Sequence, residues 1–169
     1  MPWPLIGAAT PRSLTITGCL LLLVNESPAL VHPSPSIMNQ GNVDAPIVVV
    51  IGGGFGGIAA VQALANAPVN VVLIDKENHH LFQPLLYQVA TSVLPTSNIA
   101  FPIRRIFRNQ TNAYVFNDEV VSIDCAAHRL TFRNDRCARF DYLIVAAGAN
   151  SSYFGNDQWE QFAPGMKTL

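Results

Sequence analysis

The feature that most constrains the fold is a glycine-rich run at residues 51–57, which reads IGGGFGG. Glycine costs roughly 0.5–1 kcal/mol relative to alanine inside a regular element, so such a run must serve a need for bare backbone. The spacing Gly52-x-Gly54-x-x-Gly57 has the form of a dinucleotide-binding turn. In such a turn the first glycine permits a tight bend, the second lets the backbone approach a pyrophosphate, and the third lets a helix pack closely on a strand.

The segments around the glycines have the pattern of a strand–turn–helix–strand unit. Ile47 to Ile51, IVVVI, is an unbroken apolar run typical of a parallel strand covered on both faces. From Phe55, large apolar residues recur every three positions, which predicts a helix that ends by Pro68. Val69 to Ile74 predicts a second buried strand, and Asp75 follows it at once. We therefore expect the helix N-terminus to bind phosphates and Asp75 to accept hydrogen bonds from an adenosine ribose.

The chain beyond Asp75 bears on which dinucleotide is bound, FAD or NAD. The expected elements are short helices at 84–90 and 102–107, an antiparallel meander of three strands (YVFN, EVVSID and RLTF) within 114–140, and an apolar strand at 140–147. The last strand would return Gly148 to the pyrophosphate loop. A simple NAD domain would instead continue with a helix and a third parallel strand. This layout favours FAD and disfavours an ordinary NAD-dependent dehydrogenase.

Several stretches resemble the type II, non-proton-pumping NADH:quinone oxidoreductases, also called alternative NADH dehydrogenases. They are HHLFQPLLYQVAT at 79–91, GGGFGG, DYLIVAAGA, SYFG and the terminal APGMKTL, and the resemblance extends over residues 46–169. It implies a flavoprotein with two dinucleotide domains, of which the first binds FAD and the second binds NADH. It also implies hydride transfer from NADH to FAD and onward reduction of a membrane quinone. The family's turn after the return strand usually reads Ala-Thr-Gly, whereas Ala147 occupies the threonine position here.

The resemblance also implies which residues would hold FAD. They are Gly52, Gly54, Phe55, Gly56, Gly57, Asp75, Lys76, Gln83, Pro84, Leu85, Val121, Ala147 and Gly148. Within this set, Gln83, Pro84 and Leu85 would lie against the isoalloxazine ring. Taken without the resemblance, the helical spacing of Phe82, Leu85, Leu86 and Tyr87 favours a simple helix core instead. No residue is predicted as a catalytic acid or base.

Composition and spacing exclude other classes of site. The chain has 10 basic and 11 acidic residues, so we expect no nucleic-acid partner. His79 and His80 would point in opposite directions on an extended segment, so we expect no metal site and assign them to the loop that covers the flavin.

The cysteines give a similar answer for thiol chemistry. Cys19, Cys125 and Cys137 form no C-x-x-C pair, and we expect free thiols, with a Cys125–Cys137 disulfide as the lesser alternative. Residues 76–95, where the cysteine pair of the disulfide reductases would lie, contain no cysteine, which excludes chemistry of that kind.

The first 44 residues differ from the rest of the chain. Leu14 to Val24 is an apolar run of eleven residues, too short to span a bilayer, which needs about 20. It resembles the core of a signal peptide, but no clear cleavage site follows it. We prefer a disordered or non-native leader, with Met38 as the true start.

The predicted fold class is therefore α/β, with residues 45–169 forming the N-terminal part of a Rossmann-like FAD-binding domain that combines a parallel sheet and an antiparallel β-meander. The NADH domain and the C-terminal part are expected to be missing, so a non-catalytic remnant is the main rival to an enzyme. By resemblance, the whole protein would be cytoplasmic and peripheral to the cytoplasmic membrane through its C-terminal part. The resemblance also allows a homodimer.

Overall fold

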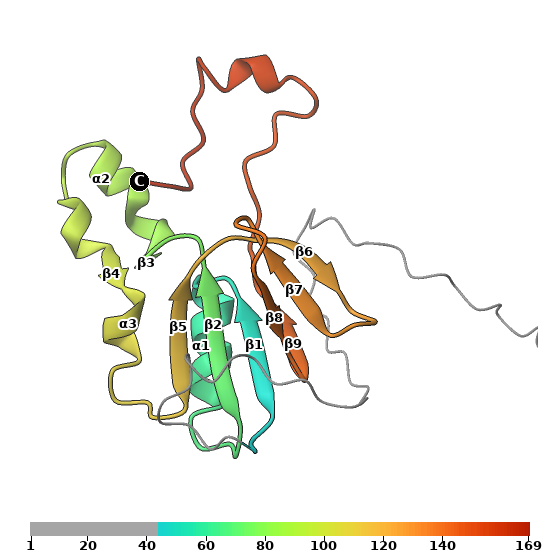
Figure 1. The fold of residues 1–169 in the computed structure, drawn as a ribbon. Helices are drawn as coiled ribbons and strands as arrows, with labels where there is room; N and C mark the ends of the chain where they lie inside the picture. Colours follow the sequence, from blue (N-terminus) through green and yellow to red (C-terminus); the bar gives the residue numbers. More distant parts are fainter. Residues whose placement is uncertain (1–43) are drawn as a thin grey trace, which may run out of the picture.

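The computed structural model describes residues 44–169, whose arrangement is shown in Figure 1. The predictions for the leader, including Leu14 to Val24, Met38 and Cys19, lie outside the described residues. None of the helices within 44–169 has the length and apolar character needed to traverse a bilayer.

A four-stranded parallel sheet forms the centre of the fold, in the order β5-β2-β1-β9. The strands are β1 (Ile47–Ile51), β2 (Asn70–Asp75), β5 (Ala113–Asn117) and β9 (Tyr142–Val145). In the register of the sheet, Val50 lies between Leu73 of β2 and Ile144 of β9. Runs of valine and isoleucine suit a sheet that is buried on both faces. The carboxyl ends of all four strands meet at one edge, which is the upper edge in Figure 1.

Helices cover one face of the sheet. α1 (Phe55–Ala63) joins β1 to β2, and the short α3 (Ile103–Ile106) precedes β5. They contribute to a buried cluster that consists of Val50, Val61, Val71, Leu73, Ile103 and Phe107. α1 has the sequence FGGIAAVQA, and its small residues let it lie close to the strands.

The opposite face is covered by an antiparallel meander. Its strands are β6 (Val120–Asp124), β7 (Arg129–Phe132) and β8 (Cys137–Arg139). Ile123, Leu130 and Phe132 of the meander pack with sheet residues such as Val49 and Ile74 in a second buried cluster. The predicted meander is confirmed, but its third strand is Cys137–Arg139 and not YVFN.

The strand at YVFN is the main correction to the sequence analysis. It belongs to β5, which pairs in parallel with β2 in the register Val72↔Tyr114. The prediction that no third parallel strand follows Asp75 was therefore wrong. A strand of five residues carries no local signal for its partner, and the long crossover of residues 76–112 made a parallel return hard to recognise.

The crossover itself is more ordered than expected. β3 (His79–Leu81) and β4 (Ala100–Pro102) form an antiparallel pair within it. The helix expected at 84–90 is a 3₁₀ turn, η1 (Gln83–Leu85), followed by α2 (Leu86–Ala90), and η2 (Thr96–Asn98) leads into β4. A last 3₁₀ turn, η3 (Asp157–Trp159), lies in the irregular segment after β9. The predictions for β1, α1, β2, the helix before β5, and β9 are confirmed.

Candidate functional site

The glycine turn between β1 and α1 begins with a backbone conformation that only glycine adopts easily. Gly52 has φ +103°, and a Cβ built on it would stand 2.3 Å from the carbonyl oxygen of Ala146. Its N–H donates to the carbonyl of Ile74 on β2 (2.8 Å). This position therefore needs glycine for both its φ angle and its close contact with the chain that leaves β9.

The last glycine of the motif fixes how closely α1 approaches the turn. A Cβ on Gly57 would stand 1.8 Å from the carbonyl oxygen of Gly52, a distance that no side chain can occupy. Gly56 has ordinary packing, since its Cβ would meet the Ala146 Cβ at 3.7 Å. The roles predicted for Gly52 and Gly57, a tight bend and close packing, are confirmed.

Gly54 differs from both, because it faces open space. It is the N-cap of α1 with φ −74°, and a Cβ built there would meet nothing within 4 Å. No side chain caps the helix, and the first carbonyl in it, that of Gly54, accepts from Ile58 (3.0 Å). The amides ahead of Ile58 belong to the first turn, which has no carbonyl partner within an α-helix. The turn therefore presents backbone donors and the positive end of the helix dipole beside an open region.

Asp75 lies at the carboxyl end of β2, directly against this turn. Its Oδ2 accepts a hydrogen bond from the N–H of Gly53, and its Oδ1 accepts one from the N–H of Glu77 (2.6 Å). The strand end is held in turn by Asn117 of β5, whose amide nitrogen donates to the carbonyls of Asp75 (3.1 Å) and Lys76 (2.8 Å). The acid predicted 23 positions after Gly52 is thus in contact with the turn.

His80 also contacts the glycine turn, although the sequence predicted for it only a place in a loop that covers the flavin. It lies on β3, the residue is 9% exposed, and its Nδ1 lies 3.0 Å from the carbonyl oxygen of Gly53. The ring of Phe55 meets the imidazole edge to face at 4.9 Å and the ring of Phe82 at 5.4 Å. His79 lies between buried and exposed, which fits the predicted alternation of the two histidines along a strand.

The other predicted site residues are spread along the carboxyl edge of the sheet. Ala147 and Gly148 follow β9 and are exposed, and Gly148 has φ +73° with open space where a Cβ would be. Lys76 is exposed directly after β2, and Val121 is exposed on β6. Figure 1 shows β6 and the arm that carries α2 on opposite sides of this edge.

The predicted isoalloxazine contacts lie in that arm. Gln83 and Pro84 are exposed and Leu85 is half-buried in η1, directly after Phe82. The structure thus brings together the glycines, Asp75 and the end of β9, and joins η1 to them through the contact of Phe82 with Phe55. Within residues 44–169, the side chains of Lys76 and Val121 make no hydrogen bond or ion pair with the turn.

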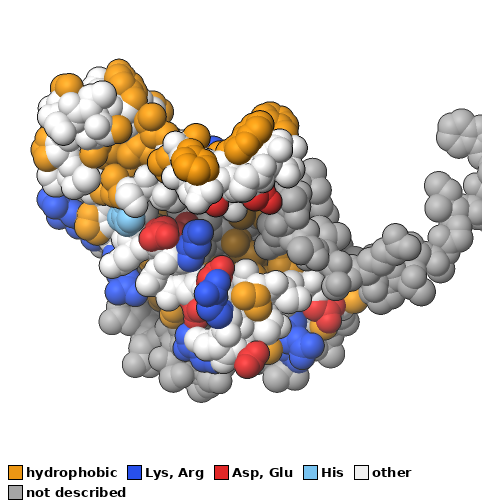
Figure 2. Space-filling view, turned by 90° about the horizontal axis from the view of Figure 1, so that it is seen from above, with side chains coloured by type: hydrophobic (Ala, Val, Ile, Leu, Met, Phe, Trp, Pro, Cys, Tyr) orange, Lys and Arg blue, Asp and Glu red, His pale blue; other side chains and the backbone are white. Residues whose placement is uncertain are grey.

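Large apolar side chains are exposed above the same edge. Figure 2 looks down on it and shows hydrophobic side chains gathered on the side of α2 and over the segment after β9. The exposed residues of these two regions include Phe82, Tyr87, Val93, Phe101, Phe154, Trp159 and Phe162. Exposed apolar surface of this kind is typical of a region that contacts another surface.

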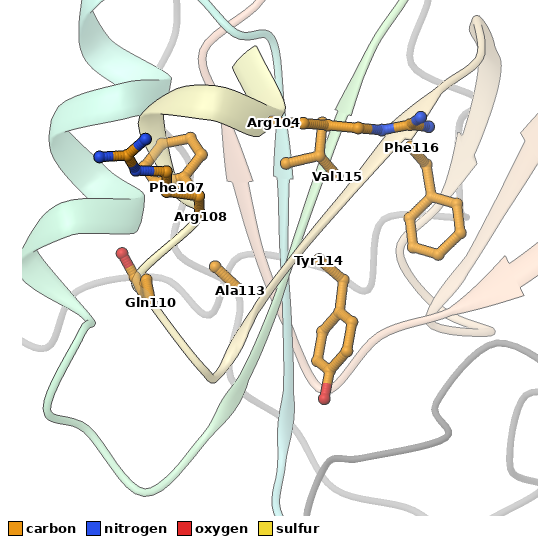
Figure 3. Close-up of a pocket in the computed structure, with 8 residues that line it drawn as sticks. All are labelled: Arg104, Phe107, Arg108, Gln110, Ala113, Tyr114, Val115 and Phe116. Carbon is orange, nitrogen blue, oxygen red and sulfur yellow. The ribbon is translucent and has the colours of Figure 1, made fainter. Parts of the chain in front are cut away.

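A separate hollow of about 330 Å³ runs along β5, the edge strand of the sheet (Figure 3). It is lined by Arg104, Phe107, Arg108, Gln110, Ala113, Tyr114, Val115 and Phe116, none of which is a predicted site residue. The side chains of Arg104 and Arg108 extend in opposite directions, so their guanidinium groups do not converge on one anion. The hollow is therefore a weaker candidate than the glycine turn.

The structure also shows where the metal-ligating side chains and the cysteines of residues 44–169 lie. No group of three His, Cys, Asp or Glu side chains in this range could hold a metal ion. Cys125 and Cys137 are free and exposed in the meander, so the alternative of a disulfide between them is wrong.

A parallel sheet whose first strand runs through a glycine turn into a helix, with an acid at the end of the second strand, defines a Rossmann-like domain. The chain belongs to the pyridine nucleotide-disulphide oxidoreductase family, whose sequence profile matches residues 46–168.

Similarity to individual proteins is more informative than the family profile. Type II NADH:quinone oxidoreductase NdhA of Mycobacterium tuberculosis is 51% identical over 125 residues, which cover 72% of this chain and 27% of the relative. Type II NADH:quinone oxidoreductase Ndh of the same bacterium is 47% identical with the same coverage. The X-ray structure of the sulfide:quinone oxidoreductase of Aquifex aeolicus matches with a TM-score of 0.63 at 30% identity, over 69% of this chain and 27% of that chain. The predicted relationship to type II NADH:quinone oxidoreductases is confirmed, and the chain spans about a quarter of the length of these relatives.

The two kinds of glycine in the turn can be separated by stability. We expect Gly57→Ala to lower the free energy of unfolding by more than about 2 kcal/mol, because its methyl group would overlap the Gly52 carbonyl. Gly54→Ala, with an ordinary φ and open space, should change it by less than about 0.5 kcal/mol. Urea denaturation of the two variants and the parent measures both values, and equal values for the two variants would contradict the packing described.

Proposed function

We propose that this chain supplies the FAD-binding region of a flavoprotein NADH:quinone oxidoreductase. The observation that carries the proposal is the open space over Gly54, at an uncapped helix N-terminus. A pyrophosphate in that space would accept hydrogen bonds from the backbone of the turn and would be stabilised by the helix dipole. Gly54 has an ordinary φ and free space, so neither its backbone conformation nor its packing demands glycine, whereas the approach of a ligand to the bare backbone would.

Asp75 fits the adenosine side of the same ligand. Its two oxygens already accept from the N–H groups of Gly53 and Glu77. An ionised carboxylate offers about four acceptor sites, so both ribose hydroxyls can still be bound. The contact with Gly53 also keeps the acid beside the phosphate-binding turn, which is the geometry that an adenosine diphosphate unit requires.

The preference for FAD over NAD rests on the connection from β5 to β9 and not on the number of parallel strands. β5 supplies a third parallel strand, so the strand order alone no longer disfavours an NAD domain. The connection from β5 to β9 is a three-stranded meander, however, whereas an NAD-binding Rossmann domain uses helices for such crossovers. The similarity to type II NADH:quinone oxidoreductases supports the same choice. An isolated protein without flavin absorbance would favour the NAD alternative.

The redox chemistry belongs to the cofactor, and the chain binds and orients it. When bound, the flavin ring accepts hydride and passes electrons on, while the protein contributes position and electrostatics. We assign Gln83, Pro84 and Leu85 to the flavin ring, since η1 stands next to the start of α1 through the contact of Phe82 with Phe55. Ala147 and Gly148 would complete the site from the end of β9, and Phe55, Gly56, Lys76 and Val121 would line its margins.

NADH is the proposed donor and a quinone the proposed acceptor, as the names of the two mycobacterial relatives indicate for those proteins. Both substrates, a peripheral position on the cytoplasmic membrane and a homodimer are proposed for the whole protein. The described residues alone would supply only the FAD side of the reaction.

Substitution of Asp75 tests the adenosine side of the site. Hydrogen bonds to a charged group contribute about 1.5–3 kcal/mol, so Asp75→Ala should weaken FAD binding by roughly tenfold to a hundredfold. Glu77→Ala removes the same charge two residues away and serves as the matched control, with affinity close to that of the parent. Fluorescence titration with FAD gives the three dissociation constants. Unchanged affinity in Asp75→Ala would show that Asp75 does not bind the ribose.

Gly54→Val tests the phosphate side. The new side chain would occupy the open space over the turn, so we expect no FAD binding at concentrations that saturate the parent. Gly54→Ala should lose less affinity because it fills less of that space. Circular dichroism should remain close to that of the parent for both variants. If Gly54→Val protein purifies as yellow as the parent, the turn is not the phosphate site.

The chain by itself should not reach the turnover of a complete enzyme. Hydride transfer needs the nicotinamide held about 3–3.5 Å from the flavin, and by resemblance that position is set by a second dinucleotide domain. A steady-state assay of the purified chain with NADH, added FAD and a short-chain quinone measures this. Turnover in the usual range of about 1–10³ per second would contradict the expectation and show that residues 1–169 suffice for catalysis.

A further inference from the structure

The peptide groups next to Gly53 are held on both sides by side chains from other strands. The Gly53 N–H donates to Oδ2 of Asp75 at the end of β2, and the Gly53 carbonyl oxygen lies 3.0 Å from Nδ1 of His80 on β3. Gly53 and His80 are both buried, whereas the next residue, Gly54, is exposed. Gly53, whose N–H and carbonyl are both held, thus directly precedes the exposed Gly54.

The chemistry of this contact specifies the protonation of the imidazole. A carbonyl oxygen can only accept a hydrogen bond, so Nδ1 of His80 must carry the proton for the contact to be a bond. The imidazole is also held from a second side by the edge-to-face contact with Phe55. Its strand is fixed by β4, in the register His80↔Phe101. The donor therefore approaches Gly53 from a supported position.

Fixing the Gly53 carbonyl also fixes the neighbouring amide. The peptide bond is planar and trans, so the N–H of Gly54 points opposite to the Gly53 carbonyl and thus away from His80. A turn of three consecutive glycines has large conformational freedom, and without external contacts its amides would take many directions. Two side-chain hydrogen bonds remove that freedom before a ligand arrives, which lowers the ordering cost of binding.

We propose that His80 is a positioning residue for the dinucleotide site: its Nδ1–H sets the orientation of the Gly53–Gly54 peptide, and so of the first helix amides, while Asp75 holds the preceding Gly52–Gly53 peptide. The proposal rests on the proposed function, since the ligand in question is FAD. His80 acts through the backbone of the turn and does not itself contact the reacting atoms.

Two substitutions of nearly equal shape test the role of the donor. His80→Asn keeps an N–H donor at the position of Nδ1, whereas His80→Leu has a similar branched shape and no donor. Asn78→Leu, at an exposed position two residues before His80, is the matched control. Each variant and the parent are measured by hydrogen exchange of the Gly53 amide without added FAD, and by titration with FAD.

We expect His80→Leu to exchange the Gly53 amide about tenfold faster and to bind FAD about tenfold more weakly, with His80→Asn and Asn78→Leu close to the parent. A merely structural role would lower thermal stability equally in the Asn and Leu variants and would not show this rescue. Equal exchange in His80→Leu and the parent would overturn the proposal.

The ¹⁵N spectrum of the histidines in the parent gives a test that needs no variant to fold. Nδ1 of His80 should be protonated at neutral pH, and a bare Nδ1 with the proton on Nε2 would overturn the proposal. If the parent binds no FAD, the proposed function fails, while the exchange rates and the ¹⁵N spectrum still decide the role of His80.

Discussion

The structure depends first on the contact between the start of α1 and the turn that precedes it. Gly57 approaches the carbonyl of Gly52 so closely that a Cβ would stand 1.8 Å from it. This contact allows the chain to leave β1, reverse at Gly52 and lay α1 back on the sheet within a few residues. The position of α1 then determines the covered face of the sheet and brings the helix N-terminus to the carboxyl edge. The location of the candidate site at that edge therefore follows from the packing of two backbone segments.

The same glycines that permit this packing leave the turn with little rigidity of its own. The structure compensates with contacts from parts of the chain that are distant in sequence. Asp75 holds the Gly53 amide, His80 holds its carbonyl, and the chain after β9 lies against Gly52 through Ala146. The turn is therefore supported by the end of β2, by β3 and by the chain that leaves β9. A pyrophosphate needs a bare backbone in order to come close, and strong binding needs amides with a fixed direction. The contacts around the turn allow both.

The two faces of the sheet are covered by different kinds of structure, and this difference bears on the ligand. Helices α1 and α3 cover one face and the β6-β7-β8 meander covers the other, each through its own buried cluster. The meander connects β5 to β9 and so replaces the crossover helix of a simple NAD-binding domain. The arm with η1 and α2 and the segment after β9 remain above the edge with exposed aromatic side chains (Figures 1 and 2). The type II relative NdhA is about four times as long as the region that matches this chain.

The sequence by itself determined the unit from β1 to Asp75 and the position of the candidate site on it. Its signals are local: apolar periodicity within five or six residues, and glycines spaced two to five positions apart. The strand at YVFN was wrongly assigned to the meander, because its place beside β2 depends on a pairing across about 40 residues that no short pattern encodes. The bond from His80 to Gly53 was likewise invisible, since alternation along a strand predicts which way a side chain points but not what it meets. Only the tertiary structure decided these points, because strand order and side-chain partners are set by the packing of the whole sheet and not by the propensities of each segment.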